Sequence, residues 1–373
     1  MKSAAFFDLD RTLLPKASGA IFGKYLEAEG LTTGTHVPGA SLAMSFYELF
    51  GETRLNMTLT SQFVKTAAGW PVAKVEHAAK LAAQDLADAV LGHAKVVMDK
   101  HRAEGTKLVL ATTTPTVFVE PFAERMGFDA VLATEWSHDG KAFDGTTVGP
   151  FVWGPKKRDA IVDWAKANKV SLKDSYGYSD SYFDAPMLDA VGHAVAVNPD
   201  ARLTAIAALQ GWEIRSFDAP RGVMKVLGRE IQQWLEPFRK IEPVAFASFE
   251  FNGLENIPSE GGAILAFNHR SYFDAFAMNL LLAKVGRPCR FLGKKEMFDT
   301  PLVGPLLQSM GGILVDRGTG SNTPLLKAEE ALRAGELVAI APQGTIPRGP
   351  AFFDPVLKGR PGAAQLAIDS KAP

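Results

Sequence analysis

The sequence predicts an α/β protein that begins with a doubly wound parallel sheet and continues into a second α/β domain. Strand and helix signals alternate up to about residue 217, which is the pattern of a parallel sheet with helices on both faces. Short apolar runs, such as residues 4–7 (AAFF) and 107–111 (KLVLA), indicate buried strands that end in polar residues. With 373 residues the chain also exceeds what one hydrophobic core usually supports, so we expect two domains.

Two aspartates one residue apart follow the first apolar run directly. Asp8 and Asp10 therefore lie at the carboxyl end of a predicted strand, where open α/β sheets place their sites. Two like charges so close together are costly unless a cation neutralises them, which indicates bound Mg²⁺. A strand that merely ends in a polar turn would show the same pair, so other segments of the chain are needed to distinguish a metal site from such a turn.

Three later segments carry the residue types of a phosphate site. The strand at 107–111 ends in Thr112, whose hydroxyl can hold a phosphate oxygen. Lys157 belongs to a lysine pair at the start of a helix, where it would neutralise a phosphorylated carboxylate, although such pairs are often ordinary surface. Residues 176–184 (YGYSDSYFD) add two more acids, Asp180 and Asp184.

Taken in order, these segments resemble the four motifs of the haloacid dehalogenase (HAD) phosphatases, in the phosphoserine-phosphatase-like branch (subfamily IB). The resemblance implies that Asp8 is the nucleophile, that Asp10 is the general acid and base, and that Thr112 and Lys157 bind the phosphate. It also implies Mg²⁺ held by Asp8, Asp10, Asp180 and Asp184, where Asp184 either binds the metal or supports another ligand. Ser179 stands where many relatives have glycine. Because the acid that follows is kept, we expect the metal site to survive.

A mostly helical insert at about residues 15–90 separates the first two motifs. Its position resembles the small helical cap of this branch, which closes over the nucleophile and selects the substrate. The pattern over residues 73–104 predicts a helix. The resulting HAD-like domain covers residues 1–217.

Composition and charge are those of an ordinary globular protein, with 47% hydrophobic and 22% charged residues and a net charge of −1. No nucleic-acid-binding character follows from that total. From residue 221 onward, 18 Lys and Arg against 15 Asp and Glu make the second half slightly basic, which fits a phosphate-bearing substrate or an anionic lipid surface. A single cysteine, Cys289, favours a reducing compartment. The absence of a signal peptide and of a run of about 18 apolar residues predicts a soluble or peripheral protein.

Residues 218–222, within the stretch SFDAPRG, form the predicted linker to a second domain at 223–373. That domain opens with an amphipathic pattern over residues 223–241. Its apolar positions recur at helical spacing, with basic residues between them, and comprise Val223, Leu227, Ile231, Trp234, Leu235 and Phe238. Such a helix can lie in a membrane interface. Packing of the same stripe against the second domain is an equally good interpretation.

A histidine and an aspartate five residues apart follow another predicted strand at 262–267. A loop that enters a helix can bring the carboxylate of Asp274 onto the imidazole of His269, fixing its tautomer. No serine nucleophile with suitable spacing is visible. The imidazole would therefore deprotonate a substrate hydroxyl, which would attack an activated acyl group.

This block resembles the NHxxxxD motif of the glycerolipid acyltransferases, the lysophosphatidate acyltransferase family. Two further blocks of that family follow in order, at residues 311–317 (GGILVDR) and 342–345 (PQGT). The resemblance implies that Arg317, together with Lys295, binds the substrate phosphate. It implies an acceptor pocket lined by Gln343, Gly344 and Thr345.

Two departures limit this second resemblance. Gln343 replaces the usual glutamate, so a charge is lost while size and hydrogen-bonding reach are kept. Family members also continue into a further strand and a fourth block, so we expect the chain to be truncated at its carboxyl terminus.

Together the resemblances imply a bifunctional phospholipid-biosynthesis enzyme. The second domain would acylate 1-acylglycerol-3-phosphate from acyl-CoA or acyl carrier protein to give phosphatidic acid, while the first hydrolyses a phosphomonoester with Mg²⁺. Two alternatives remain. In one, only the phosphatase is active and the second domain docks it to lipid; in the other, the HAD domain merely supports a working acyltransferase. A cytoplasmic protein on the inner face of the membrane is the expected location, with an anionic membrane surface contacted by residues 223–241.

Overall fold

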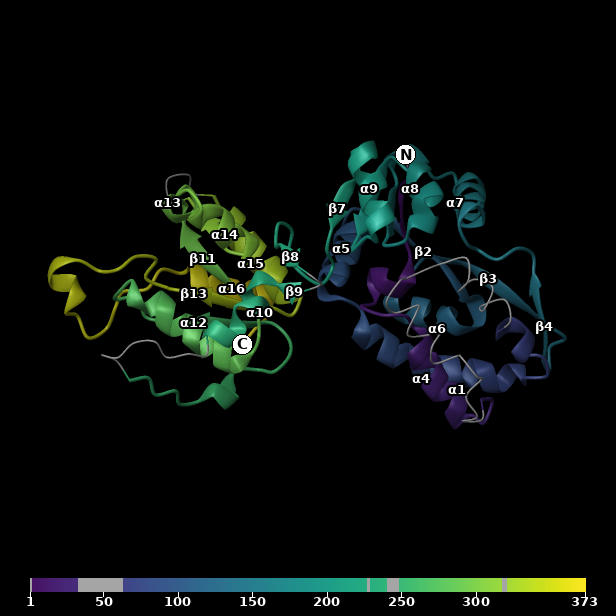
Figure 1. The fold of residues 1–373 in the computed structure, drawn as a ribbon, viewed down its shortest axis with the longest axis horizontal. Helices are drawn as coiled ribbons and strands as arrows, with labels where there is room; N and C mark the ends of the chain where they lie inside the picture. Colours follow the sequence, from purple (N-terminus) through teal and green to yellow (C-terminus); the bar gives the residue numbers. More distant parts are fainter. Residues whose placement is uncertain (1, 33–62, 227–228, 240–247, 317–320) are drawn as a thin grey trace. The chain divides into compact units, whose positions relative to one another are not determined.

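The structure, a computed structural model, describes residues 2–32, 63–226, 229–239, 248–316 and 321–373 (Figure 1). The chain divides into two compact units, Met1–Asp218 (unit 1) and Ala219–Pro373 (unit 2). Each unit contains a parallel sheet covered by helices, so the α/β fold expected for both parts is confirmed.

A seven-stranded sheet forms the centre of unit 1. Its strand order is β4-β3-β2-β1-β5-β6-β7, and all neighbours are parallel except β3 and β4. The order runs outward on both sides of β1, as in a doubly wound sheet, which places a site at the carboxyl ends of the central strands. The strands are β1 (Ala4–Phe7), β2 (Lys107–Pro115), β3 (Ala130–His138), β4 (Phe143–Val148), β5 (Tyr176–Ser179), β6 (His193–Val197) and β7 (Glu213–Arg215).

Both faces of this sheet are buried, and the residues of β1 alternate between them. Phe7 belongs to the core cluster that includes residues of α1, α4, α5 and α6, whereas Phe6 belongs to the cluster formed with α7, α8 and α9. The helices are α1 (Gly19–Ala28), α4 (Val72–Ala89), α5 (Gly92–Ala103), α6 (Thr116–Met126), α7 (Pro155–Ala167), α8 (Ala185–Asp189) and α9 (Ala201–Gln210).

The helix predicted over residues 73–104 is in fact two helices, α4 and α5. Val90, after the end of α4, is extended with a ψ of 128°, and the backbone N–H of Leu91 donates to the carbonyl of Leu13 at 2.9 Å. This bond to the loop after β1 replaces a bond within the helix. Of the predicted cap, α1 and α4 are described, and residues 33–62 lie outside the described part of the chain.

Unit 2 contains a four-stranded parallel sheet of order β10-β13-β11-β12. The strands are β10 (Ala263–Ala266), β11 (Cys289–Lys294), β12 (Ile313–Val315) and β13 (Leu337–Ile340). The buried strand β13 alternates between two core clusters, with Val338 on one face and Leu337 and Ala339 on the other. The longer helices are α12 (Phe273–Val285), α14 (Val303–Ser309), α15 (Thr323–Arg333) and α16 (Gly362–Ser370), and α13 (Lys295–Phe298) is a single turn.

The amphipathic helix predicted for residues 223–241 is wrong for the residues that the structure describes. They form a hairpin of β8 (Lys225–Val226) and β9 (Arg229–Glu230), then two short helices, α10 (Ile231–Trp234) and α11 (Glu236–Arg239). Trp234, expected on the apolar face of that helix, is 42% exposed and donates its indole N–H to the carbonyl of Val226 at 2.8 Å.

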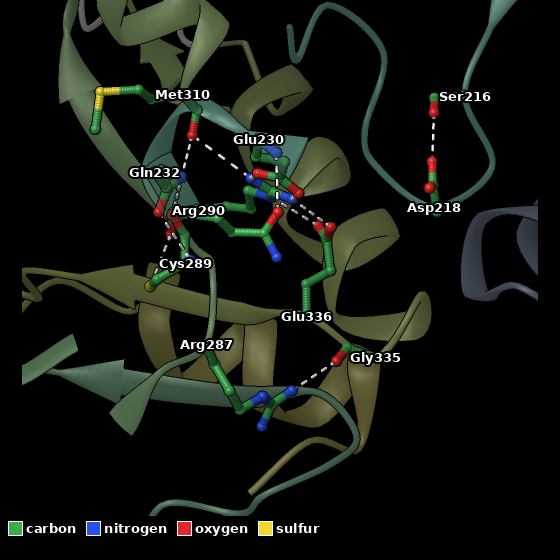
Figure 2. A network of polar contacts seen from close by, with 11 residues as sticks. Ser216, Asp218, Glu230, Gln232, Arg287, Cys289, Arg290, Met310, Gly335 and Glu336 are labelled. Carbon is green, nitrogen blue, oxygen red and sulfur yellow. Dashed lines mark hydrogen bonds and ion pairs between the residues drawn. The ribbon is translucent and has the colours of Figure 1, made fainter. Parts of the chain in front are cut away.

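Buried polar contacts explain this difference (Figure 2). The carboxylate of Glu230 accepts two hydrogen bonds from the Arg290 guanidinium, at 2.6 and 2.8 Å. Gln232 donates to the backbone carbonyls of Cys289, at 3.1 Å, and Met310. Glu336 also accepts from Arg290, at 2.7 Å. A fully buried arginine needs such partners, so they hold the segment on the sheet and override the helical periodicity.

Burial lowers the pKa of Arg290, but its hydrogen bonds with Glu230 and Glu336 outweigh that effect and hold the pKa above its usual value. The guanidinium therefore stays charged.

Among all the residues that the structure describes, no helix is both long and apolar enough to cross a membrane.

Candidate active sites

The first site lies where the central strands of unit 1 end. The backbone N–H of Asp8 donates to the carbonyl of Tyr178 in β5 at 3.0 Å, so the first acid is held directly at the end of β1. Thr112 is 1% exposed in the neighbouring strand β2, and its hydroxyl accepts from the N–H of Thr114 at 3.2 Å. The parallel register thus assembles residues that lie about a hundred positions apart in the chain.

Lys157, in the first turn of α7, joins two of the predicted acids. Its side chain is fully buried, and its ammonium donates to Oδ1 of Asp8 at 2.9 Å and to Oδ2 of Asp184 at 2.7 Å. Its neighbour Lys156 is exposed and pairs with Asp159 on the same helix at 3.1 Å. Only the second lysine of the pair therefore enters the site.

Ser179, the departure from the glycine of many relatives, takes part in this arrangement. Its hydroxyl donates to Oδ2 of Asp184 at 2.7 Å and accepts from the backbone N–H of Ser181 at 3.2 Å. The same carboxylate oxygen thus receives a hydroxyl as well as the ammonium of Lys157. A glycine would leave that hydrogen bond unmade.

Asp180 is held by two residues that sequence reasoning overlooked, Arg11 and Thr12. Arg11 Nε lies 3.1 Å from Oδ2 of Asp180. The hydroxyl of Thr12 donates to Oδ1 of the same carboxylate at 3.4 Å and accepts a hydrogen bond from the backbone N–H of Asp180 at 3.0 Å. Arg11 has a φ of 61°, which turns the chain after the acid pair. Their positions directly after Asp10 were the sequence feature that could have indicated a role in this site.

Asp10 accepts its hydrogen bonds from residues outside this ion-pair network. Its carboxylate accepts from the backbone N–H of Ser18 at 2.7 Å and from the hydroxyl of Thr114 at 3.5 Å. Burial raises the pKa of Asp10 above its usual value, and the hydrogen bonds with Ser18 only partly offset this. An aspartic acid that keeps its proton to higher pH is suited to give a proton to a leaving group.

The donor set suits Mg²⁺, which prefers oxygen ligands, takes one or two carboxylates and keeps several waters. Asp8 and Asp180 present buried carboxylates at adjacent strand ends, and Oδ1 of Asp184 is buried without a hydrogen-bond partner in the described residues. Over the same residues, no group of three or more His, Cys, Asp or Glu side chains is placed so that it could hold a metal ion by itself. These carboxylates therefore fit Mg²⁺ only where water and a substrate supply the remaining ligands.

The second site lies at the carboxyl ends of the neighbouring strands β10 and β13 in unit 2. His269 Nδ1 is 3.0 Å from Oδ2 of Asp274, in the first turn of α12. The same oxygen accepts the backbone N–H groups of Arg270 at 2.6 Å and Ser271 at 2.8 Å. The carboxylate is thus fixed on the side of Nδ1, which leaves Nε2 of the imidazole for a substrate hydroxyl.

Gln343, which follows β13, uses both ends of its amide beside the histidine. Its Oε1 accepts the backbone N–H of His269 at 3.3 Å, and its Nε2 donates to Oδ1 of Asn268 at 3.2 Å. A glutamate could accept but not donate. The substitution therefore fits the hydrogen bonds of this loop.

Four further residues were predicted for this site, namely Lys295, Arg317, Gly344 and Thr345. Lys295 is half-exposed and pairs with Asp316 at 3.1 Å, a contact that raises its pKa. Gly344 has a φ of 69° in the turn after Gln343, and Thr345 is exposed. Arg317 lies outside the described residues.

Comparison with known proteins assigns a family to each of the two parts of the chain. The haloacid dehalogenase-like hydrolase family matches residues 5–189, and the acyltransferase family matches residues 248–373. A phosphoserine phosphatase from Mycobacterium tuberculosis is 33% identical over 229 residues, which cover 61% of this chain and 74% of that protein. The inhibition of morphological differentiation protein from Streptomyces azureus is 33% identical over 222 residues, 59% of this chain and 80% of its own.

Among solved structures, a Bordetella pertussis protein of unknown function aligns with a TM-score of 0.51 and 26% identity. The alignment covers 58% of this chain and 99% of that one. Family, relatives and fold agree on the first part of the chain, and the family match on the second part is separate. The chain belongs to the haloacid dehalogenase-like hydrolases, and its second unit carries an acyltransferase domain.

Proposed function

We propose that unit 1 hydrolyses a phosphomonoester through a phosphorylated Asp8. The contact that carries this proposal is Lys157 between Asp8 and Asp184, with no exposed surface of its own. A buried ammonium at 2.9 Å favours the ionised form of Asp8, which is the form that attacks phosphorus.

The proton transfers fall to Asp10. In the first half-reaction, a bond forms between an Asp8 oxygen and phosphorus, the ester P–O bond breaks, and Asp10 gives its proton to the leaving alcohol. In the second, a water molecule loses a proton to Asp10 and attacks phosphorus, which releases inorganic phosphate and restores Asp8. Members of this family generally use Mg²⁺, which when bound would offset phosphoryl charge. Asp8, Asp180 and Asp184 would hold it, whereas Asp10, expected among the ligands, would keep its proton for the leaving group. Thr112 would bind a phosphate oxygen.

For unit 2 we propose acyl transfer from acyl-CoA, or acyl carrier protein, to 1-acylglycerol-3-phosphate. His269 takes the proton of the glycerol hydroxyl at Nε2 while the hydroxyl oxygen attacks the thioester carbonyl. The C–S bond then breaks, and the leaving thiolate takes the proton back from Nε2. Asp274 keeps the tautomer, because its carboxylate accepts from Nδ1 and from two backbone N–H groups. Lys295 and Arg317 would bind the phosphate, with Gly344 and Thr345 beside the acceptor.

The two activities together would make the protein a bifunctional enzyme of phospholipid biosynthesis that works from the cytoplasmic face of a membrane. The phosphatase substrate would be a lysophosphatidate, a phosphatidate or a small ester. The M. tuberculosis relative, a phosphoserine phosphatase, supports phosphoserine as the small-molecule candidate. If the phosphatase acts on phosphoserine alone, unit 2 would only dock it to lipid.

Product analysis by mass spectrometry separates these possibilities. Wild type, Asp8→Asn and His269→Ala are incubated with lysophosphatidate, acyl-CoA and Mg²⁺, and in parallel with phosphoserine. We expect phosphatidate from wild type and Asp8→Asn but not from His269→Ala. Phosphate release should be lost only in Asp8→Asn. Absence of phosphatidate from Asp8→Asn, which cannot hydrolyse that product, would refute the acyl-transfer proposal.

A further inference from the structure

Between the PQGT block and α16, unit 2 carries a loop whose apolar side chains face solvent. We call residues 348–357 (RGPAFFDPVL) the aromatic loop; in Figure 1 it is the yellow segment that extends away from the sheet of unit 2. Phe353 is 82% exposed, Val356 83% and Phe352 38%. Soluble proteins rarely expose neighbouring large apolar side chains without a partner for them.

The aromatic loop is tied to the catalytic motif of unit 2 through Arg270. The guanidinium of Arg270 donates to the carbonyl of Phe352 and, at 2.6 Å, to that of Asp354. Arg270 follows His269 directly, and its own backbone N–H binds Asp274. Two residues further on, Tyr272 is 74% exposed. The apolar surface is thus connected through Arg270 to the loop that carries His269.

The charges around these side chains are mostly positive. Arg348 opens the loop, Lys358 and Arg360 follow it, and all three are exposed, against one acid, Asp354. A small apolar tip inside a basic rim is complementary to a membrane whose lipids are anionic, because the tip enters the acyl boundary while the cations meet the phosphates.

In the described part of residues 223–241, the sequence-based candidate for this contact, the large apolar side chains are less exposed, from 36% for Leu235 to 51% for Met224, than Phe353 and Val356 in the aromatic loop. This described part is a hairpin with two short helices, held on the sheet by Glu230 and Gln232. Trp234 donates a hydrogen bond to the backbone carbonyl of Val226. The guanidinium of Arg229 lies over its ring, 5.8 Å from the centre.

We propose that the aromatic loop and Tyr272 are the surface by which unit 2 docks on an anionic phospholipid membrane. Phe353 and Val356 enter the interface, and Arg348, Lys358 and Arg360 contact the lipid phosphates. This inference rests on the proposed acyl transfer, because an acceptor embedded in the membrane must reach His269 from that side.

Flotation of the full chain with vesicles tests the inference. The vesicles contain phosphatidylglycerol and phosphatidylcholine, or phosphatidylcholine alone. Phe353→Ser removes a phenylalanine ring that would be buried in the lipid, so its partitioning into the vesicles should be weaker by about tenfold. Arg348→Gln with Lys358→Gln and Arg360→Gln should abolish the preference for the anionic vesicles. Wild-type binding should fall at high salt.

Two matched controls separate this surface from others. Leu209→Ser removes a side chain that is 87% exposed in unit 1, and Trp234→Glu changes the sequence-based candidate. Both should float like wild type. Normal flotation of Phe353→Ser, or loss of flotation in Trp234→Glu alone, would overturn the proposal. So would a dimer that Phe353→Ser dissociates in the absence of lipid, since the loop would then serve a second copy.

The outcome does not depend on catalysis. His269→Ala should float normally, and Phe353→Ser should still acylate a short-chain, water-soluble acceptor. If His269→Ala floats but Asp8→Asn forms no phosphatidate, the proposed acyl transfer fails and the docking surface stands. If wild type acylates but Phe353→Ser floats unchanged, only the docking surface fails.

Discussion

The ammonium of Lys157 lies 2.7 Å from Oδ2 of Asp184, and neither side chain is exposed to solvent. Lys157 belongs to α7 and Asp184 to the turn before α8, and the same ammonium also reaches Asp8 after β1. One buried cation therefore holds together three segments of the catalytic centre. Because a buried charge without its partner is strongly destabilising, each of these residues depends on the other two.

Lys157→Met should abolish phosphatase activity and destabilise unit 1. It leaves two buried carboxylates without their cation, at a cost of about 3–5 kcal/mol. Urea unfolding in EDTA and hydrolysis of p-nitrophenyl phosphate measure the two effects. Lys156→Met, in the exposed neighbour, is the control and should be close to wild type in both. Equal effects of the two variants would contradict the role of Lys157.

Arg11→Gln should make the stability of unit 1 more dependent on Mg²⁺. Without metal, Arg11 is the cation that faces Asp180, so its loss should lower the melting temperature in EDTA. Added Mg²⁺ should restore most of that loss, because a metal that binds only the folded state stabilises it. Thermal unfolding with and without Mg²⁺ measures this, with the exposed Arg125→Gln as control. A loss that Mg²⁺ leaves unchanged would argue against metal binding at Asp180.

Gln343→Leu should slow acyl transfer more than Gln343→Glu. Leucine removes the acceptor for the His269 N–H and the donor to Asn268, whereas glutamate keeps the acceptor. The loss of one such hydrogen bond costs about 1 kcal/mol, or roughly fivefold in rate if it is felt in the transition state. Steady-state kcat and KM for both variants test this. A slower Gln343→Glu would show that the amide donor matters most.

The stability of unit 1 should fall between about pH 6.5 and pH 4 because of His101. Burial is the largest cause that lowers its pKa to about 4, and its Nε2 lies 2.8 Å from the hydroxyl of Tyr178. In this pH window the unfolded chain binds a proton that the folded one does not, so folding weakens as pH falls, by up to about 3 kcal/mol. Urea unfolding at pH 7 and pH 5 should show a smaller difference for His101→Gln. An identical pH dependence would exclude His101 as the cause.

Glu230→Gln should destabilise unit 2 by about 3–5 kcal/mol, since it removes a charged partner of the buried Arg290. Trp234, the single tryptophan of this unit, reports its unfolding by fluorescence once the five of unit 1 are replaced by phenylalanine. The exposed Glu255→Gln serves as the control. A change no larger than that control would show that Glu336 alone satisfies Arg290.

Much of the fold followed from local patterns. Apolar runs that end in acids, threonine or histidine are short, strongly patterned signals. The structure has strands at β1, β5 and β10 with Asp8, Asp180 and His269 after them, and Thr112 lies within β2, which continues to Pro115. Periodicity failed where a tertiary contact competed with it. The helix over 73–104 breaks where Leu91 bonds to Leu13, and the stripe over 223–241 gives way to Glu230 and Gln232 on the sheet.

The sequence by itself determined the two α/β units and the residue types at their strand ends, because strand burial and motif order are local properties of the chain. Only the tertiary structure decided which charges meet: that Lys157 rather than Lys156 enters the site, that Arg11 faces Asp180, and that Arg290 binds Glu230. Ion pairs between residues 60 to 169 positions apart depend on burial and on the register of strands and helices, and no local pattern encodes those distances.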